Sequence, residues 1–219
     1  MSGTTLGAVR PPTNETEERL LDRALTLFAE KGYEAASVRE IIEATGVTRP
    51  VLYYYCANKE DLFKRLVHWK HDDAYRELAR ILRETTGCAE RLRAVARGSF
   101  AFCAADPRVP RVMFQTAFGP PIPGVSQFMD EVAALRFSII RQVTQDGLDA
   151  GELHGEDAAS LALIFCCLLD QLLNVLARLP NPEQRLTPDL ADAVVQVFLH
   201  GVGRGKTFPA DLPPFPASG

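Results

Sequence analysis

Apolar residues recur at helical spacing along nearly the whole chain, and no segment shows the alternation of apolar and polar positions that is typical of a strand. Glycine and proline separate the helical segments. The predicted fold class is therefore all-α, with a small N-terminal bundle followed by a larger helical domain. The expected helices cover residues 14–31, 37–45, 48–55, 60–85, 89–105, 108–118, 126–150, 156–179 and 187–203.

The residue types at the predicted helix ends support the prediction of the first three helices. Asn14 can cap the first, and the spacing of Ser37 and Glu40 matches a capping box, in which each side chain bonds the other residue's backbone N–H. Gly46 can end the second helix. Pro50 falls in the first turn of the third helix, where the missing N–H has no cost.

The second and third helices, with a short turn between them, have the spacing of a helix-turn-helix. In that motif the second helix lies in the major groove of DNA and its first residues touch base edges. Arg39 and Arg49 can read guanine, whereas Thr48 and Tyr54 can bind phosphates. Lys59 begins another helix, whose terminal amides also favour a phosphate.

Between Arg19 and Leu66, many residues have the order and spacing of a known protein family. These residues are Phe28, Lys31-Gly32-Tyr33, Ser37-Val38, Ile41-Ile42, Gly46-Val47, Leu52-Tyr53-Tyr54 and Asn58-Lys59-Glu60-Asp61-Leu62. In these positions the chain resembles the tetracycline-repressor (TetR) family of bacterial transcription regulators. The resemblance implies a homodimer that binds a palindromic DNA operator, represses transcription and is released by a small molecule. It covers about a fifth of the chain, and the remainder is similar only in the number and length of its helices.

The resemblance also implies a division of the chain and a set of DNA contacts. Residues 13–60 would form the helix-turn-helix DNA-binding domain, and residues 61–205 the effector-binding and dimerisation domain. Residues 1–12 and the Pro-rich residues 206–219 lack helical periodicity, so we expect disordered tails there. The implied DNA-binding residues are Ser37, Val38, Arg39, Thr48, Arg49, Pro50, Val51, Tyr53, Tyr54 and Lys59.

The helices expected at 156–179 and 187–203 are apolar on more than one face, so each should be buried on two sides. The dimer of the family is a four-helix bundle made from the last two long helices of each subunit, and these two helices fit that role. A purely intramolecular core is the alternative. The predicted dimer interface comprises Leu161, Phe165, Leu168, Leu172, Val194, Phe198 and Val202.

Aromatic and methionine side chains are frequent between residues 100 and 137, around a GPPIPG sequence at 119–124. Such residues are typical of a core, but they can also line an adaptable apolar pocket for a hydrophobic, neutral or weakly charged effector. Several polar residues could orient that effector. The predicted pocket comprises His68, Phe102, Met113, Phe114, Gln115, Phe118, Phe128, Phe137, Cys166, Asp170 and Asn174.

The five cysteines form no CxxC pair, which argues against a disulfide framework or a zinc site. Cys56 stands where the family usually has phenylalanine, so it is either a small buried hydrophobe or an oxidant-sensitive thiol near the DNA. Tyr53, Tyr54 and Tyr55 cannot all be buried on a short helix. His68 and His71 could begin a metal site, but we expect a solvated helix face there, and we predict no metal and no cofactor.

Charge and composition limit the classes of function. With 47% hydrophobic residues, the chain is not intrinsically disordered. The formal net charge is −4, and residues 1–65 carry nine basic and ten acidic residues, so no broad positive field indicates a nucleic-acid partner. Binding to DNA should therefore use few phosphate contacts and depend only weakly on salt.

A soluble, cytoplasmic protein is expected, because the N-terminus lacks the apolar segment of a secretory signal and the apolar run Leu161 to Leu169 spans only nine residues. Two other classes of function stay open. One is a helical enzyme that uses His154 or His200, although no catalytic motif supports it. The other is a protein–protein adaptor with the form of a helix-turn-helix. The favoured interpretation is a non-enzymatic, dimeric repressor that binds double-stranded DNA and a small hydrophobic effector, with no membrane partner.

Overall fold

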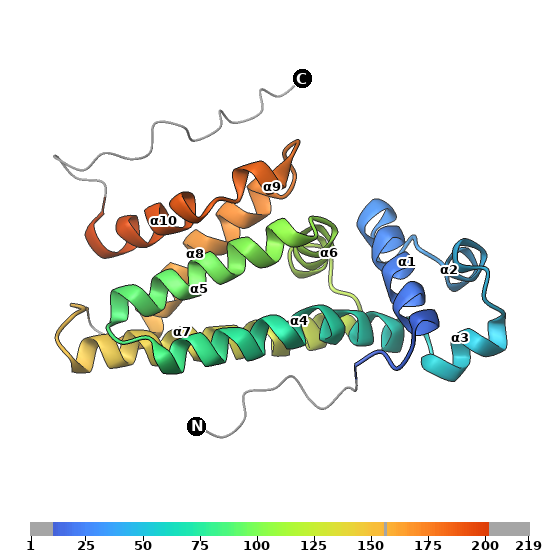
Figure 1. The fold of residues 1–219 in the computed structure, drawn as a ribbon, viewed down its shortest axis with the longest axis horizontal. Coiled ribbons are helices and arrows are strands. Elements are labelled where there is room, and N and C mark those ends of the chain that lie inside the picture. Colours follow the sequence, from blue (N-terminus) through green and yellow to red (C-terminus); the bar gives the residue numbers. More distant parts are fainter. Residues whose placement is uncertain (1–10, 156, 202–219) are drawn as a thin grey trace. The chain divides into compact units, whose positions relative to one another are not determined.

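The computed structural model describes residues 11–155 and 157–201. No strand occurs in this part of the chain, which confirms the all-α prediction. Its helices (Figure 1) are α1 (Glu15–Lys31), α2 (Val38–Thr45), α3 (Arg49–Tyr55), α4 (Lys59–Glu84), α5 (Cys88–Ala105), α6 (Arg108–Ala117), α7 (Val125–Asp149), α8 (Ala158–Leu176), α9 (Pro182–Arg185) and α10 (Pro188–His200). Most of the predicted tail residues, 1–10 and 206–219, lie outside the described residues.

The sequence does not predict the short helix α9. Prolines at 180 and 182 indicate a break, but Pro182 occupies the first turn of α9, where its fixed φ suits a helix. Asn181 precedes it in the left-handed region, with φ 53°. The single turn closes when the Leu186 N–H donates to the Pro182 carbonyl at 3.0 Å.

Two compact units make up the chain. Unit 1 holds the residues up to Arg76 together with Arg108–Leu135, and unit 2 holds Glu77–Pro107 together with the residues from Arg136 onward. Helices α4 and α7 therefore each contribute one segment to each unit. The boundary predicted at residue 60 falls in the first turn of α4.

Unit 1 is built on the buried face of α1. Asn14 caps this helix by accepting the Glu17 backbone N–H at 3.0 Å, as predicted. Phe28 of α1 packs against Phe63 of α4 with ring centroids 5.7 Å apart, and Tyr33 completes the aromatic cluster. Arg108 of α6 donates to side-chain oxygens of α1, which joins these two helices.

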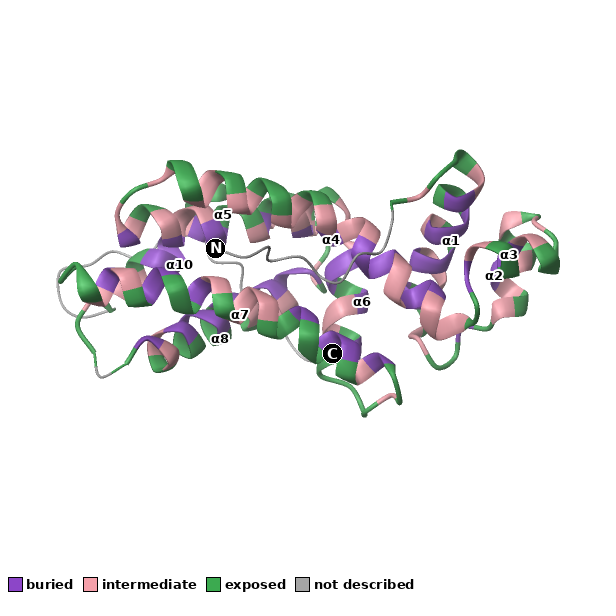
Figure 2. Cartoon of the chain, turned by 90° about the horizontal axis from the view of Figure 1, so that it is seen from below, coloured by how far each residue is buried: buried purple, intermediate pink, exposed green. Residues whose placement is uncertain are grey.

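Unit 2 is a bundle in which α5 lies against α8, α9 and α10 (Figure 1). Phe165 of α8 meets Phe198 of α10 edge-on, with ring centroids 5.1 Å apart. Thr144 of α7 donates its hydroxyl to the Ala158 carbonyl at 2.8 Å and thereby ties α7 to the start of α8. Helix α8 carries both buried and exposed residues along its length (Figure 2).

By length and composition alone, α8 could cross a membrane, because it joins 19 residues of high hydropathy. The nine-residue run counted in the sequence is interrupted by Asp170, but the helix continues through it. The Asp170 carboxylate forms an ion pair with Arg136 of α7. A helix of this kind is equally typical of the core of a helical bundle, and α8 packs against α5 and α10.

Candidate DNA interface and effector site

The helix-turn-helix is formed by α2 and α3, and its ends are built as the sequence predicts. Ser37 Oγ accepts the Glu40 backbone N–H at 3.2 Å, and the Glu40 carboxylate accepts the Ser37 N–H at 2.9 Å. Gly46 ends α2 with φ 69°, a left-handed conformation that suits glycine. Thr48 precedes α3, but its side chain makes no capping hydrogen bond. Pro50 in the first turn is therefore the residue whose type suits the start of this helix.

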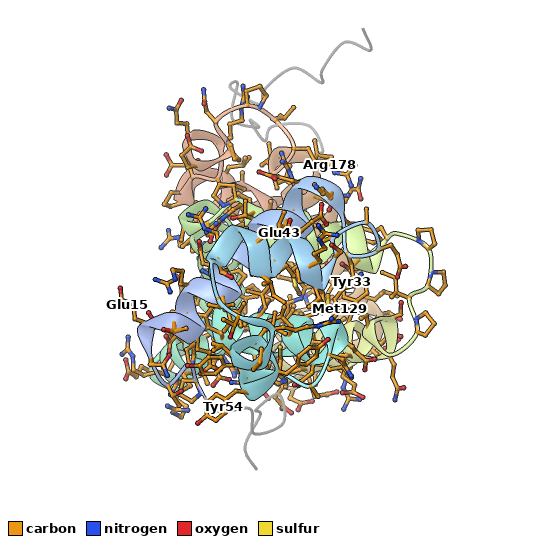
Figure 3. All side chains as sticks on the ribbon, turned by 90° about the vertical axis from the view of Figure 1, so that its right-hand side faces the viewer. Glu15, Tyr33, Glu43, Tyr54, Met129 and Arg178 are labelled. Atoms are coloured by element: carbon orange, nitrogen blue, oxygen red, sulfur yellow. The ribbon has the colours of Figure 1, made fainter. Side chains whose placement is uncertain are left out.

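One face of this motif is exposed and carries most of the residues predicted to bind DNA. Tyr54 is 78% exposed and points away from the helices in Figure 3. Tyr53 is 44% exposed, and the Arg49 guanidinium lies 5.8 Å from the centroid of its ring. The prediction that at least one of the three tyrosines faces solvent is confirmed. Ser37, Arg39, Thr48 and Pro50 are exposed as well, and Val38 and Val51 are half-buried.

The cations predicted at this face are partly engaged within the protein. Arg39 Nε donates to Glu43 Oε1 at 2.7 Å, an exposed ion pair along α2. The Lys59 ammonium donates to the carbonyls of residues 33, 34 and 36 at 2.7, 3.2 and 3.0 Å. It also lies 4.3 Å from the centroid of the Tyr33 ring. Lys59 therefore stabilises the turn that leads into α2, and its contact with a phosphate stays a prediction.

Cys56, which differs from the usual family pattern, and the preceding Tyr55 both have a structural role. The Tyr55 hydroxyl donates to Asn14 Oδ1 at 3.0 Å, so the end of α3 is held by the residue that caps α1. Cys56 is buried, and its thiol donates to the Leu52 carbonyl at 3.4 Å. Burial raises the pKa of Cys56 to about 12, which favours the small buried hydrophobe over the oxidant-sensitive thiol.

A buried ion pair behind the motif joins α1 to α4. The Glu17 side chain has no exposed area, and its carboxylate pairs with the Arg65 guanidinium. The same carboxylate accepts the backbone N–H and the hydroxyl of Thr13, both at 2.9 Å. Burial works to raise the pKa of Glu17, but the bonds from Thr13 and Arg65 outweigh it and lower the pKa. The sequence predicts neither partner, because the residues lie 48 positions apart.

The residues of the predicted effector pocket fall on both units. In unit 1, His68 is buried beside Phe128, with ring centroids 5.3 Å apart. Phe114 stacks on Phe118 at 5.9 Å, and Phe118 is exposed. Met113 is half-buried and Gln115 is exposed.

The solvated helix face predicted at His68 and His71 is wrong, because both imidazoles are buried. His71 Nδ1 bonds the Val67 carbonyl at 2.9 Å. Burial lowers the pKa of His68, and the nearby Asp72 opposes this only in part, so its ring is neutral at pH 7. Among the described residues, no group of three His, Cys, Asp or Glu side chains is placed to hold a metal.

The other predicted pocket residues belong to unit 2. Phe102 and Phe137 are half-buried, and Cys166 is buried on α8. Asp170 and Asn174 follow Cys166 at intervals of one helical turn. Arg136, which the sequence does not predict as part of the site, is the ion-pair partner of Asp170.

The structure places some residues of the predicted dimer interface in the core and others at the surface. Phe165 has no exposed area and Val194 is buried, so both belong to the core of unit 2 and cannot form a surface. Leu168 is exposed, while Leu161, Leu172 and Phe198 are half-buried. Val202 lies outside the described residues. The exposed face of α8 instead presents two residues that the sequence does not predict, Leu163 at 56% and Ile164 at 53% exposure.

Residues 20–66 match the family model of bacterial regulatory proteins of the tetR family. The N-terminal helix-turn-helix is thus of the TetR type. The HTH-type transcriptional activator FasR of Mycolicibacterium smegmatis is similar to this chain, with 32% identity over 109 residues, which are 50% of each protein. The chain thus spans about half the length of that curated relative.

Two solved structures share the fold of this chain over most of its length. The fatty acid degradation regulator FadR from Bacillus halodurans covers 87% of this chain and 98% of its own, with a TM-score of 0.77 and 22% identity. FadR from Bacillus subtilis, solved in complex with stearoyl-CoA, covers 85% of this chain and 99% of its own, with a TM-score of 0.71 and 20% identity. At these identities the likeness shows the fold alone.

Proposed function

We propose that the chain is a DNA-binding transcription regulator of the TetR family, a repressor that leaves a palindromic operator when a small hydrophobic effector binds. The observation that carries this proposal is the exposed face of α2 and α3, where Arg49, Tyr53 and Tyr54 lie on the second helix of a helix-turn-helix whose first helix has a capping box. Exposed aromatic rings are otherwise unfavourable in water, so a partner that contacts them explains their position.

The chain acts by binding and not by catalysis in this proposal. The enzyme alternative relies on His154 or His200, and both are exposed to solvent. Catalytic histidines usually work beside an orienting partner in a site that excludes water. The adaptor alternative relies on the low charge of the N-terminal region. An adaptor, however, gives no reason for exposed arginine and tyrosine side chains on the second helix of the motif.

The second copy in the proposed homodimer would cover the exposed apolar face of α8, which consists of Leu163, Ile164 and Leu168. Ile164 and Leu168 lie four residues apart and share one side of the helix, and Leu163 directly precedes Ile164. Replacing Ile164 by glutamate should convert the dimer to a monomer in analytical ultracentrifugation. The same change at Gln145, an exposed residue of α7, should leave the dimer intact.

The effector would bind in unit 2 and carry a long apolar part. The half-buried Phe102 and Phe137, which belong to the same unit as the polar residues of α8, support this proposal. The complex of the B. subtilis FadR with stearoyl-CoA suggests fatty acyl compounds as the first molecules to test.

Selection of bound duplexes from a random DNA pool tests the proposed function, with the purified full-length protein at two salt concentrations. A regulator should enrich a palindrome whose half-sites lie about one helical turn apart. Arg49→Ala and Tyr54→Ala should each weaken binding to this operator about tenfold or more. Arg23→Ala removes the same charge from the exposed side of α1 and should have little effect. Failure to enrich any sequence with a folded dimer would reject the regulator and favour the adaptor.

A further inference from the structure

A small polar cluster interrupts the apolar interior of unit 2. Cys166, Asp170 and Asn174 share one face of α8, because they are spaced by four residues each. The Arg136 guanidinium of α7 pairs with the Asp170 carboxylate. The buried thiol of Cys103 on α5 lies within the electrostatic influence of this ion pair, as does Cys166. Helices α5, α7 and α8 thus meet around a charged pair.

Two oxygen atoms in this cluster are buried without a donor. Asp170 Oδ1 and Asn174 Oδ1 accept no hydrogen bond from any of the residues that the structure describes. Buried oxygens in native proteins nearly always have a partner, since an unpaired acceptor bears the full cost of its desolvation. Two unpaired oxygens one turn apart on the same helix therefore indicate a place where a donor is supplied by another molecule.

The charges around the two oxygens determine which kind of hydrogen-bond donor can bind to them. Arg136 balances the charge of Asp170, so an added ion would leave an unpaired charge in a partly buried site. The thiols contribute no charge at pH 7, because burial raises the pKa of Cys103 to about 12 and that of Cys166 to about 11. An ionised Asp170 can only accept, whereas the Asn174 amide can present either its oxygen or its nitrogen. A hydroxyl can satisfy both residues by donating to Asp170 and accepting from the Asn174 nitrogen, and a secondary amide can do so with its N–H and its carbonyl oxygen.

We propose that Asp170 and Asn174 bind the polar group of the effector and that this group is an uncharged hydrogen-bond donor, a hydroxyl or an amide N–H, on an otherwise apolar molecule. The inference rests on the proposed function and specifies its effector. The same chemistry can come from a long-chain alcohol or from the amide groups in the pantetheine arm of an acyl-CoA. A free fatty acid, which is an anion at pH 7, is excluded because Asp170 would repel it.

Four probes with the same ten-carbon chain separate these possibilities: decan-1-ol, decanoate, methyl decyl ether and decanoyl-pantetheine. Each is titrated into the full-length protein by calorimetry, without DNA. We expect the alcohol, the pantetheine thioester or both to bind at least about tenfold more tightly than the ether and decanoate, because only they can donate a neutral hydrogen bond to a charged acceptor. Preference for one of the two identifies the source of the donor.

Asn174→Leu is the decisive variant. It replaces an unpaired polar group with an apolar group of similar volume, so the melting temperature should stay the same or rise. The same variant should reduce the preference for donors, because only Asp170 then remains as an acceptor. Gln171→Leu changes an exposed neighbour on α8 and should preserve the preference. Asp170→Asn is less suitable, because it leaves Arg136 without its counter-charge.

The titrations decide the proposal even if a variant fails to fold. Equal affinities for all four probes, tighter binding of decanoate, or binding of none of them would overturn it, and solvent would then satisfy the two oxygens. A donor preference that Asn174→Leu leaves undiminished would also reject the role of Asn174. Operator binding is measured on the same samples without probe. Intact operator binding without donor preference rejects only the effector site, whereas donor preference without operator binding rejects only the regulator.

Discussion

Replacement of Glu17 by glutamine is the sharpest test of how unit 1 is held together. The substitution keeps the size of the side chain and removes its charge, while Arg65 stays only 13% exposed in its side chain. The guanidinium would then be left partly buried without a counter-charge. Glu18→Gln removes the same charge from the next residue, which is exposed, and serves as the matched control.

The size of the effect follows from the burial of the pair. Loss of one partner from a buried ion pair costs about 3–5 kcal/mol of folding free energy. Glutamine can still accept one bond from Thr13, which offsets a part of this cost, so we expect a loss of about 3 kcal/mol. The control should change stability by no more than about 0.5 kcal/mol.

Urea denaturation followed by far-UV circular dichroism measures the change, at a fixed protein concentration because a dimer unfolds with concentration dependence. Acid provides an independent check. The pKa of Glu17 is lowered below its ordinary value of 4.5, so its contribution is complete above about pH 4.5 and is lost as the pH falls through the folded-state pKa. The difference between wild type and Glu17→Gln should therefore shrink in acid.

The explanation fails if Glu17→Gln unfolds at the same urea concentration as Glu18→Gln. A second variant separates charge from packing, because Glu17→Leu combined with Arg65→Met replaces the pair by apolar groups of similar size. Such replacements of buried pairs are often neutral or stabilising. The double variant should thus be more stable than Glu17→Leu alone, and the opposite order would show that Arg65 has another essential contact.

Three further substitutions test single contacts in unit 1. Lys59→Met should destabilise the protein by about 2 kcal/mol in urea, because three turn carbonyls lose a cationic donor; an unchanged midpoint would show that solvent replaces it. Tyr55→Phe should leave the melting temperature nearly unchanged but weaken operator binding by up to about fivefold in an anisotropy titration, since α3 loses its bond to α1. Gly124→Ala should cost about 1 kcal/mol, because its φ of 73° strains a residue with a Cβ, whereas the flexible Glu60 side chain can move away from that Cβ. Gly151→Ala has a similar φ of 70° and open space around it, so similar losses are expected, and a much larger loss at Gly124 would show that Glu60 cannot move.

Local signals in the sequence were sufficient for the helices and their ends. A capping residue acts on backbone groups two or three positions away, so Asn14, Ser37 and Gly46 can be interpreted without knowledge of the fold. The same holds for the exposure of the short helix α3, which is too short to bury three tyrosines. Contacts between distant segments have no such signal, and the partners Glu17 and Arg65 became evident only from the structure.

The apolar residues of α8 show why a face is harder to predict than a helix. When a helix is apolar on more than one face, the spacing of its apolar residues no longer distinguishes the face that packs within the subunit from the face that is exposed to solvent. Phe165 and Leu168 are both plausible interface residues in the sequence, yet the first is buried and the second is exposed. Only the positions of α5 and α10 decide between them.

Most basic side chains in the second half of the near-neutral N-terminal region bind acceptors within the protein. Four of the basic residues from Arg39 onward bind acceptors within the protein: Arg39 with Glu43, Lys59 with backbone carbonyls, Lys64 with Glu60 and Arg65 with Glu17. Arg49 is exposed at the start of α3, and its guanidinium lies 5.8 Å from the centroid of the Tyr53 ring. Since phosphate contacts add affinity for any DNA and base contacts select the sequence, a face with one prominent arginine and two tyrosines favours selectivity over general attraction. A low net charge is therefore compatible with a DNA-binding role, because it reduces binding to non-operator DNA more than binding to the operator.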